Sequence, residues 1–207
     1  MIRLYYSDIL SARKTCAAAR YLKSSLDYVY LDLAKGEQQS PDYLALNPNG
    51  KVPTLVEEAR TTWEADAVIC RLSQLAGAAL WPQDPVPQVD LIRWLSWNAQ
   101  HFGRARGALY FEHIVRPRFG LGERNRPSVN EALADFRRYA AVLDQHLDGK
   151  TWIIGEALTV ADFSMAATLP YADAARLPLE EFPHIRRWHD QLNDFDAWRA
   201  PFPASFH

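Results

Sequence analysis

The chain has 207 residues, 48% of them hydrophobic, which is enough to bury one large core or two smaller ones. Its 23 basic and 25 acidic side chains give a formal net charge of −2, with no long run of one sign, so neither nucleic acid nor an anionic membrane surface is predicted as a partner. We find no run of about 18 apolar residues and no signal-peptide pattern, and we therefore predict a cytoplasmic protein that contacts no membrane.

The two cysteines, Cys16 and Cys70, each lie within an apolar pattern. Neither belongs to a CxxC motif, so a reducing compartment and buried thiols are predicted. The histidines form no spacing with acids or cysteines that is typical of a metal site, and no metal is predicted.

The first 77 residues alternate between strand-like and helix-like patterns. Apolar runs and period-two alternation predict strands over 2–6, 27–33, 54–57 and 61–63. Apolar residues at helical spacing predict three helices, which begin at Ser11, at the capping pair Ser40-Pro41 and at Glu64. The order βαβαββα indicates a small thioredoxin-like α/β domain.

A proline-rich stretch, "WPQDPVP", follows this domain. It is typical of a stiff linker. Beyond Gln88 the pattern is helical to the end of the chain, with stop signals such as Gly149 and a capping pair, Thr159 and Asp162. We predict a domain over 1–79, a linker over 80–87 and an all-α bundle over 88–207.

This organisation resembles the cytosolic glutathione transferases, and in particular bacterial, serine-type members that are theta-like or nu-like. Three segments carry the resemblance over nearly the whole chain: "LDLAKGEQQSPDYLALNPNGKVPTLVE" (Leu31–Glu57), "WEADAVI" (Trp63–Ile69) and "LTVADF" (Leu158–Phe163). The resemblance implies a homodimer, joined across the third helix and the first long helix of opposite subunits. It also implies glutathione as cosubstrate.

Pro53 lacks the N–H that a strand needs, so a proline there belongs at the first residue of an edge strand or in a special turn. The resemblance implies a cis Val52-Pro53 bond that aims the backbone of Val52 at the cysteinyl group of glutathione. A trans bond at an ordinary edge strand is the alternative.

Glutathione carries a thiol with an ordinary pKa of about 8.5, which a transferase must lower. Two features of a protein lower a thiol pKa: a hydroxyl that donates a hydrogen bond to the sulfur, and the positive end of a helix. Ser11, at the start of the first helix, matches the thiol-contacting residue of the family's serine-type members. The alternatives are that Ser11 is only an N-cap and that the role falls to Tyr5, to Tyr6 in a shifted register, or to Ser7.

By resemblance, Glu64 receives the γ-glutamyl ammonium, although a carboxylate there is also simply favourable in a first helical turn. The family usually has serine where this chain has Ala65, which offers only its backbone N–H to the γ-glutamyl carboxylate. Asp66 either adds a negative charge beside that carboxylate or points away from it. Lys51 and Gln38 are expected at the glycyl end of glutathione.

The second substrate is expected near the first long helix of the all-α domain. The residues proposed to line that site are Ile9, His101, Phe102, Arg106 and Tyr110. The last four have a spacing that lets them share a helix face, but aromatic residues at this spacing also form cores.

Three functions remain open from the sequence. The first is a glutathione transferase whose thiolate attacks an electrophilic carbon, a peroxide or a disulfide. The second is a non-catalytic docking module with the same fold, which Ala65 and Asp66 favour. Glutathione-dependent isomerisation or dehalogenation is a third, ranked lower because the isomerase group's Ser-Ser-Cys pattern is absent from the loop Ser7–Ser11.

Overall fold

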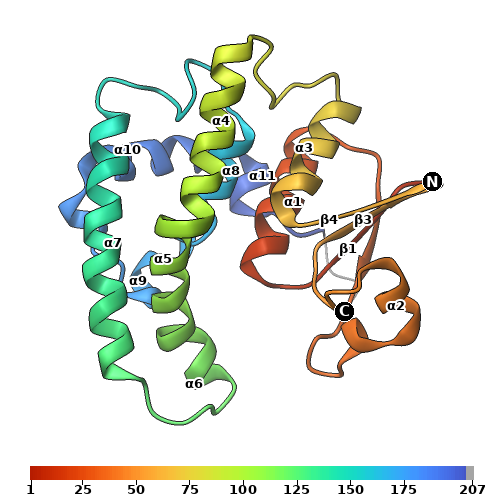
Figure 1. Cartoon of the computed structure of the whole chain (residues 1–207), viewed down its shortest axis with the longest axis horizontal. Helices are drawn as coiled ribbons and strands as arrows, with labels where there is room; N and C mark the ends of the chain where they lie inside the picture. Colours follow the sequence, from red (N-terminus) through yellow and green to blue (C-terminus); the bar gives the residue numbers. More distant parts are fainter. Residues whose placement is uncertain (204–207) are drawn as a thin grey trace. The chain divides into compact units, whose positions relative to one another are not determined.

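A computed structural model describes residues 1–203, which divide by their contacts into two units. Unit 1 comprises residues 1–83 and 193–203, and unit 2 comprises Asp84–Leu192 (Figure 1). Residues 193–203 therefore group with the first unit, whereas the sequence had placed them with the helical domain. None of the helices within residues 1–203 is both long and apolar enough to cross a membrane.

Unit 1 is built on a mixed four-stranded sheet. Its strands are β1 (Arg3–Tyr6), β2 (Asp27–Tyr30), β3 (Thr54–Glu57) and β4 (Arg60–Trp63). They lie in the order β2-β1-β3-β4, with β1 parallel to β2 and antiparallel to β3, and with β3 antiparallel to β4. The predicted thioredoxin-like topology is thereby confirmed.

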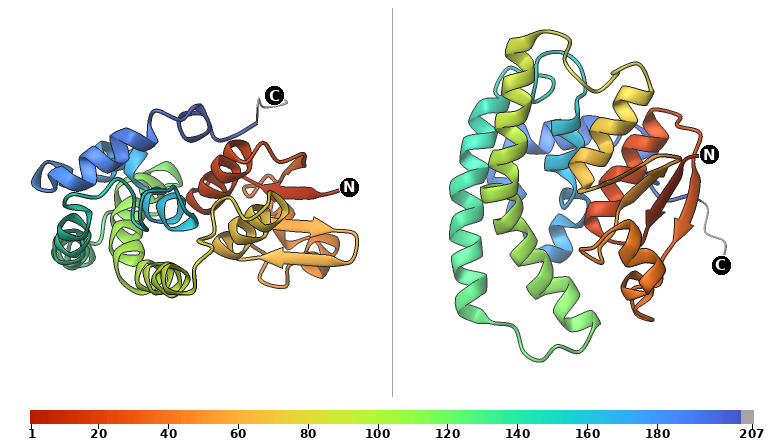
Figure 2. Two further views of the ribbon diagram at one scale, coloured as in Figure 1. Left: turned by 90° about the horizontal axis from the view of Figure 1, so that it is seen from above. Right: turned by 45° about the vertical axis from the view of Figure 1, so that its right-hand side comes forward.

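The period-two alternation of β1 divides the core of unit 1 in two. Leu4 and Tyr6 pack with apolar residues of α1 (Leu10–Tyr21) and α3 (Ala65–Leu75), which lie side by side (Figure 2). Tyr5, on the other face, packs with the cluster of α2 (Pro41–Leu46) and Val52. Apolar side chains therefore pack on both faces of β1.

Local capping signals account for several helix ends in unit 1. Ser40 accepts a hydrogen bond from the backbone N–H of Tyr43, and Pro41 is the first residue of α2, as predicted. The start of α1 differs from the prediction: Ile9 is the N-cap and Leu10 is the first helical residue. Ser11 is therefore free of a capping role.

The chain returns to unit 1 at its end through α11 (Asp196–Arg199). Arg13 of α1 donates from Nη2 to the carbonyl oxygen of Trp198 at 2.8 Å, and its guanidinium carbon lies 4.8 Å from the centre of the indole ring. This buried contact explains why the residues after 192 group with the first unit.

Both cysteines belong to unit 1. Cys16 is fully buried, as predicted, and burial raises the pKa of its thiol to about 12. Cys70 is partly buried, and burial raises the pKa of its thiol to about 11. Both thiols are therefore protonated near neutral pH.

Unit 2 is helical throughout. Its α-helices are α4 (Pro85–Trp97), α5 (Gly103–Tyr110), α6 (Arg116–Arg118), α7 (Arg126–Leu147), α8 (Val160–Ala166), α9 (Ala172–Ala175) and α10 (Pro183–Leu192). Two π-helical turns, Asn98–Phe102 and Phe111–Val115, join α4, α5 and α6 into one continuous helical stretch. Helix α5 packs along α7 (Figure 1). The predicted linker extended too far, because Pro85 already occupies the first turn of α4, where a proline is tolerated.

Asp162 organises the core of unit 2. It completes the predicted capping box with Thr159, whose backbone N–H and hydroxyl both donate to Oδ2, at 2.8 and 3.0 Å. The other carboxylate oxygen accepts from the backbone N–H of Ile153 at 3.1 Å and from Nε1 of Trp188 at 2.9 Å. Burial raises the pKa of Asp162, and these four hydrogen bonds oppose that shift.

Candidate functional site

The turn before β3 has the special geometry that the sequence suggested, because the Val52-Pro53 peptide bond is cis. The carbonyl oxygen of Lys51 accepts from Oη of Tyr43 at 2.6 Å and from Nδ2 of Asn47 at 2.8 Å. Asn47 also donates to the hydroxyl of Thr54 at 3.1 Å. Side chains of α2 and of the residue after it therefore hold the turn on both sides of Pro53.

Ser11 faces this turn. It is the second residue of α1, and its hydroxyl donates to the carbonyl oxygen of Val52 at 3.1 Å, across 41 positions of sequence. Ser11 does not cap the helix, because Ile9 is the N-cap residue of α1. A hydroxyl, the first turn of an α-helix and the backbone of Val52 thus meet at one point.

The other thiol candidates have packing roles. The ring of Tyr5 packs on Tyr43 with centroids 5.6 Å apart, on the α2 face of the sheet. Tyr6 is buried, and burial raises the pKa of its hydroxyl. Ser7 is buried, and its carbonyl oxygen accepts from the N–H of Ile9 at 2.8 Å.

The start of α3 presents Glu64, Ala65 and Asp66. Glu64 is exposed and has a left-handed backbone, with φ 69°, an unusual conformation for a residue with a side chain. Ala65 is buried with 7% exposure. Asp66 forms an ion pair with Lys14 of α1 at 2.5 Å, so its charge is neutralised by a neighbouring helix. This pairing favours the second alternative for Asp66.

Gln38 and Lys51 differ in their surroundings. Gln38 lies in a short 3₁₀-helix, Glu37–Gln39, and its Oε1 is buried without a hydrogen-bond partner among residues 1–203. Such an atom is costly to leave unsatisfied, which is a reason to expect a ligand there. The side chain of Lys51 is exposed.

Two residues expected to line the second-substrate site are buried inside unit 2. Phe102 is fully buried and stacks on Phe136, with ring centroids 5.6 Å apart. Arg106 is 5% exposed, and its guanidinium donates to groups of the helical core: Asn98 Oδ1, the carbonyl oxygen of Ser164 and the hydroxyl of Thr168. We correct the expectation accordingly, since such burial leaves no surface for a substrate.

The remaining three stay candidates. His101 is exposed and packs against Tyr139, with ring centroids 5.0 Å apart. Tyr110 is half-buried against Tyr171 at 5.5 Å, and burial raises the pKa of its hydroxyl. Ile9, which is half-buried, belongs to unit 1 and packs at its core.

Sequence reasoning missed three residues that shape this region: Tyr43, Asn47 and Lys14. The signal for the first two was available, because "LNPNG" places an asparagine beside a turn whose carbonyl groups need donors. Lys14 carried no such signal, since its pairing with Asp66 joins two helices 52 positions apart.

A thioredoxin-like sheet with a cis-proline turn that faces a helical hydroxyl, in one chain with an all-helical unit, defines the glutathione-transferase class of fold. Residues 11–75 match the family model for the N-terminal domain of glutathione S-transferase, and residues 103–194 match the model for its C-terminal domain. The chain therefore belongs to the glutathione S-transferase family.

Individual relatives agree with this assignment. The chain is 27% identical to glutathione S-transferase D6 of Drosophila melanogaster over 86% of its own length and 80% of the relative's. It is 30% identical to a glutathione S-transferase domain-containing protein of Dictyostelium discoideum, over 81% and 66% of the two lengths. A solved glutathione S-transferase I, bound with lactoylglutathione, has the same fold, with a TM-score of 0.88, 20% identity and 97% of each chain covered.

Among residues 1–203, no group of three or more histidine, cysteine, aspartate or glutamate side chains is arranged to hold a metal ion.

Proposed function

We propose that this chain is a glutathione transferase in which the hydroxyl of Ser11 and the N-terminus of α1 stabilise the thiolate of bound glutathione. One observation carries the proposal: the Ser11 hydroxyl lies 3.1 Å from the carbonyl oxygen of Val52, beside the backbone expected to bind the cysteinyl residue. When glutathione binds, that hydroxyl turns from the carbonyl oxygen to the sulfur. A charge-assisted hydrogen bond then replaces a neutral one.

The other proposed contacts are with the charged groups at the two ends of glutathione. The exposed carboxylate of Glu64 receives the γ-glutamyl ammonium. The backbone N–H of Ala65, at the start of α3, binds the γ-glutamyl carboxylate together with the positive end of the helix. Lys51 and Gln38 bind the glycyl carboxylate, and amide rotation lets Gln38 present its NH₂ group as donor.

The reaction is a nucleophilic substitution. The thiol proton passes to solvent, the thiolate attacks an electrophilic carbon, a C–S bond forms, and the leaving group departs with the electron pair. Reduction of an organic peroxide or a disulfide by the same thiolate is a related activity, with glutathione as the reductant.

The test is a pH titration of the protein with glutathione, followed by thiolate absorbance, together with conjugation of a chlorodinitrobenzene and release of chloride. We expect bound glutathione to ionise well below its ordinary pKa of about 8.5. An absence of binding at millimolar glutathione would overturn the proposal.

A docking module is the second candidate function. Ala65 favours it, because it removes a hydroxyl from the proposed γ-glutamyl site. The second argument for it is weaker than the sequence suggested, because Asp66 is paired with Lys14. Absent glutathione binding in the titration above would make docking the better interpretation.

Ala65→Ser is expected to tighten glutathione binding about tenfold. The new hydroxyl adds a donor to a charged carboxylate, which contributes about 1.5 kcal/mol at the lower end of its range. Calorimetric titration measures the change. Ala67→Ser is the matched control, because Ala67 is exposed on the same helix and should leave the affinity unchanged. Equal affinities for Ala65→Ser and the wild type would contradict the assignment of this helix terminus.

We also propose that the protein is a homodimer. On α4, three apolar side chains are more than half exposed: Val86 at 73%, Val89 at 66% and Ile92 at 54%. Apolar residues exposed together on one helix are typical of a protein–protein contact. Sedimentation at micromolar concentration tests the proposal, and a monomeric mass would contradict it.

A further inference from the structure

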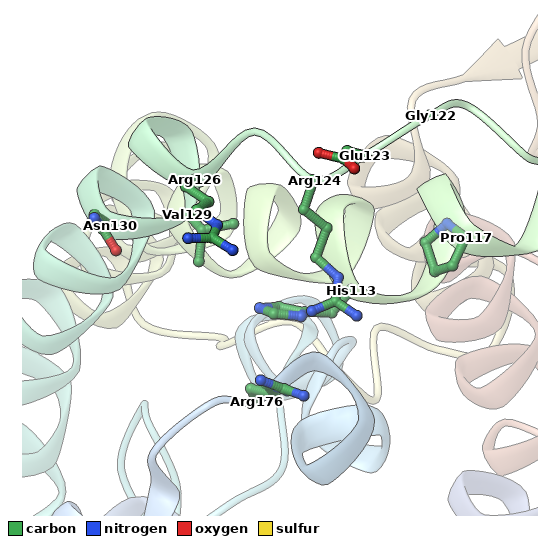
Figure 3. A pocket seen from close by; sticks show the side chains of 9 residues that line it. All are labelled: His113, Pro117, Gly122, Glu123, Arg124, Arg126, Val129, Asn130 and Arg176. Atoms are coloured by element: carbon green, nitrogen blue, oxygen red, sulfur yellow. The ribbon is translucent and has the colours of Figure 1, made fainter.

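Unit 2 contains a cavity of about 730 Å³ that takes no part in the site described above (Figure 3). The cavity is lined by residues from the end of the helical stretch that runs from α5 through α6, from the loop that follows, from the start of α7 and from the end of α9. Its charged and polar side chains are His113, Glu123, Arg124, Arg126, Asn130 and Arg176. The volume suits a small organic ligand.

The cavity concentrates positive charge in a chain whose net charge is −2. Arg124, Arg126 and Arg176 line it, and among residues 1–203 none of their side chains forms an ion pair or a hydrogen bond. Other arginines of unit 2 are paired: Arg116 holds Glu112 at 2.8 Å, and Arg137 holds Glu181 at 2.7 Å. The three arginines of the cavity therefore lack the carboxylate partner that Arg116 and Arg137 have.

Glu123 does not supply that partner. Figure 3 shows its carboxylate pointing away from His113, whereas Arg124 extends towards the imidazole and Arg176 lies on the other side of it. An anion between them would face two guanidinium groups and the histidine.

His113 supplies an independent indication of a ligand. Its Nδ1 is buried and has no hydrogen-bond partner among residues 1–203. Burial lowers the pKa of His113, Arg124 and Arg176 lower it further, and only Glu112 opposes them. The imidazole is therefore neutral near pH 7, and in the tautomer with the proton on Nδ1 it has an N–H donor without an acceptor among residues 1–203.

Arg176 also has an unusual backbone. Its φ is 56°, in the left-handed region that glycine occupies far more readily than arginine. Glycine would suit this backbone better than arginine does, so the side chain is the reason to expect a role.

We propose that this cavity binds a small polyanion, with at least two anionic oxygen groups, through Arg124, Arg126, Arg176 and His113. The ligand is a di- or tricarboxylate or a phosphorylated compound, because the guanidinium fork matches carboxylate and phosphate equally well. Asn130 adds an amide donor at the wall. The site is separate from glutathione binding and stands whether or not the transferase proposal does.

The test is calorimetric titration of the full chain at constant, low ionic strength, with citrate in one arm and inorganic pyrophosphate in the other. We expect one-to-one binding of at least one probe, and the tighter arm identifies the source chemistry as carboxylate or phosphate. Arg124→Ala should weaken that binding about ten- to a hundredfold, because it removes a charge-assisted hydrogen bond.

Arg176→Gly is the second variant, and it distinguishes a loss of binding from a loss of folding. It removes a guanidinium from the cavity but places glycine where the backbone favours it, so its melting temperature should not fall below that of the wild type. Its affinity for the probe should still fall about tenfold or more. Glutathione binding by this variant should be unchanged.

Arg186→Ala is the matched control. Arg186 is exposed on α10, outside the cavity, and its removal changes the net charge by the same amount. It should leave the affinity for the probe unchanged. Equal weakening by Arg186→Ala and the cavity variants would show only a general electrostatic attraction and would overturn the proposal. No binding of either probe at 10 mM, a concentration of roughly 10⁴ times a micromolar Kd, would also overturn it.

Discussion

Ser11→Ala is expected to lower kcat/KM for conjugation about a hundredfold and to raise the pKa of bound glutathione by between about one and two units. The variant removes a hydroxyl that donates to the carbonyl oxygen of Val52 at 3.1 Å. A hydrogen bond to a charged group contributes about 1.5–3 kcal/mol, which corresponds to this range. The pH dependence of thiolate absorbance and steady-state kinetics measure the two effects.

Tyr5→Phe is the matched control for Ser11→Ala. It removes a hydroxyl but keeps the ring that packs on Tyr43, so folding should be preserved and activity should change little. The reverse result, a large loss with Tyr5→Phe and none with Ser11→Ala, would transfer the role to Tyr5. If both variants retain the lowered pKa, the N-terminus of α1 alone stabilises the thiolate.

Asp162→Ala is expected to lower the free energy of unfolding by about 3–5 kcal/mol. It leaves four buried donors without an acceptor: the N–H groups of Ile153 and Thr159, the hydroxyl of Thr159 and the indole N–H of Trp188. Urea denaturation followed by tryptophan fluorescence measures the loss.

Two further variants test whether the lost acceptor causes this loss of stability. Asp162→Asn keeps the shape of the side chain but turns one acceptor into a donor, so we expect a smaller loss than for alanine. Asp190→Ala removes an exposed carboxylate of α10 and should change stability by less than about 0.5 kcal/mol. A loss below about 1 kcal/mol for Asp162→Ala would mean that water satisfies the four donors.

The parts of the fold that the sequence determined are those with local causes. Ser40 and Pro41 start a helix, and Thr159 and Asp162 form a capping box, because each pair acts on backbone groups within one turn. Strand and helix periods likewise depend on neighbouring residues, and their order along the first 77 residues was sufficient to indicate the thioredoxin-like topology. The family resemblance depended on the same local strings.

Only the tertiary structure decided which distant residues meet. The contact of Ser11 with Val52 and the pairing of Lys14 with Asp66 depend on how α1 packs against the turn and against α3. Arg106 shows the limit most clearly, because its helical spacing placed it on a face without saying what covers that face. The period of apolar residues predicts that a helix has an apolar face and a polar face. Which residues are buried depends on the element that packs against the helix, and that element can be far away in sequence.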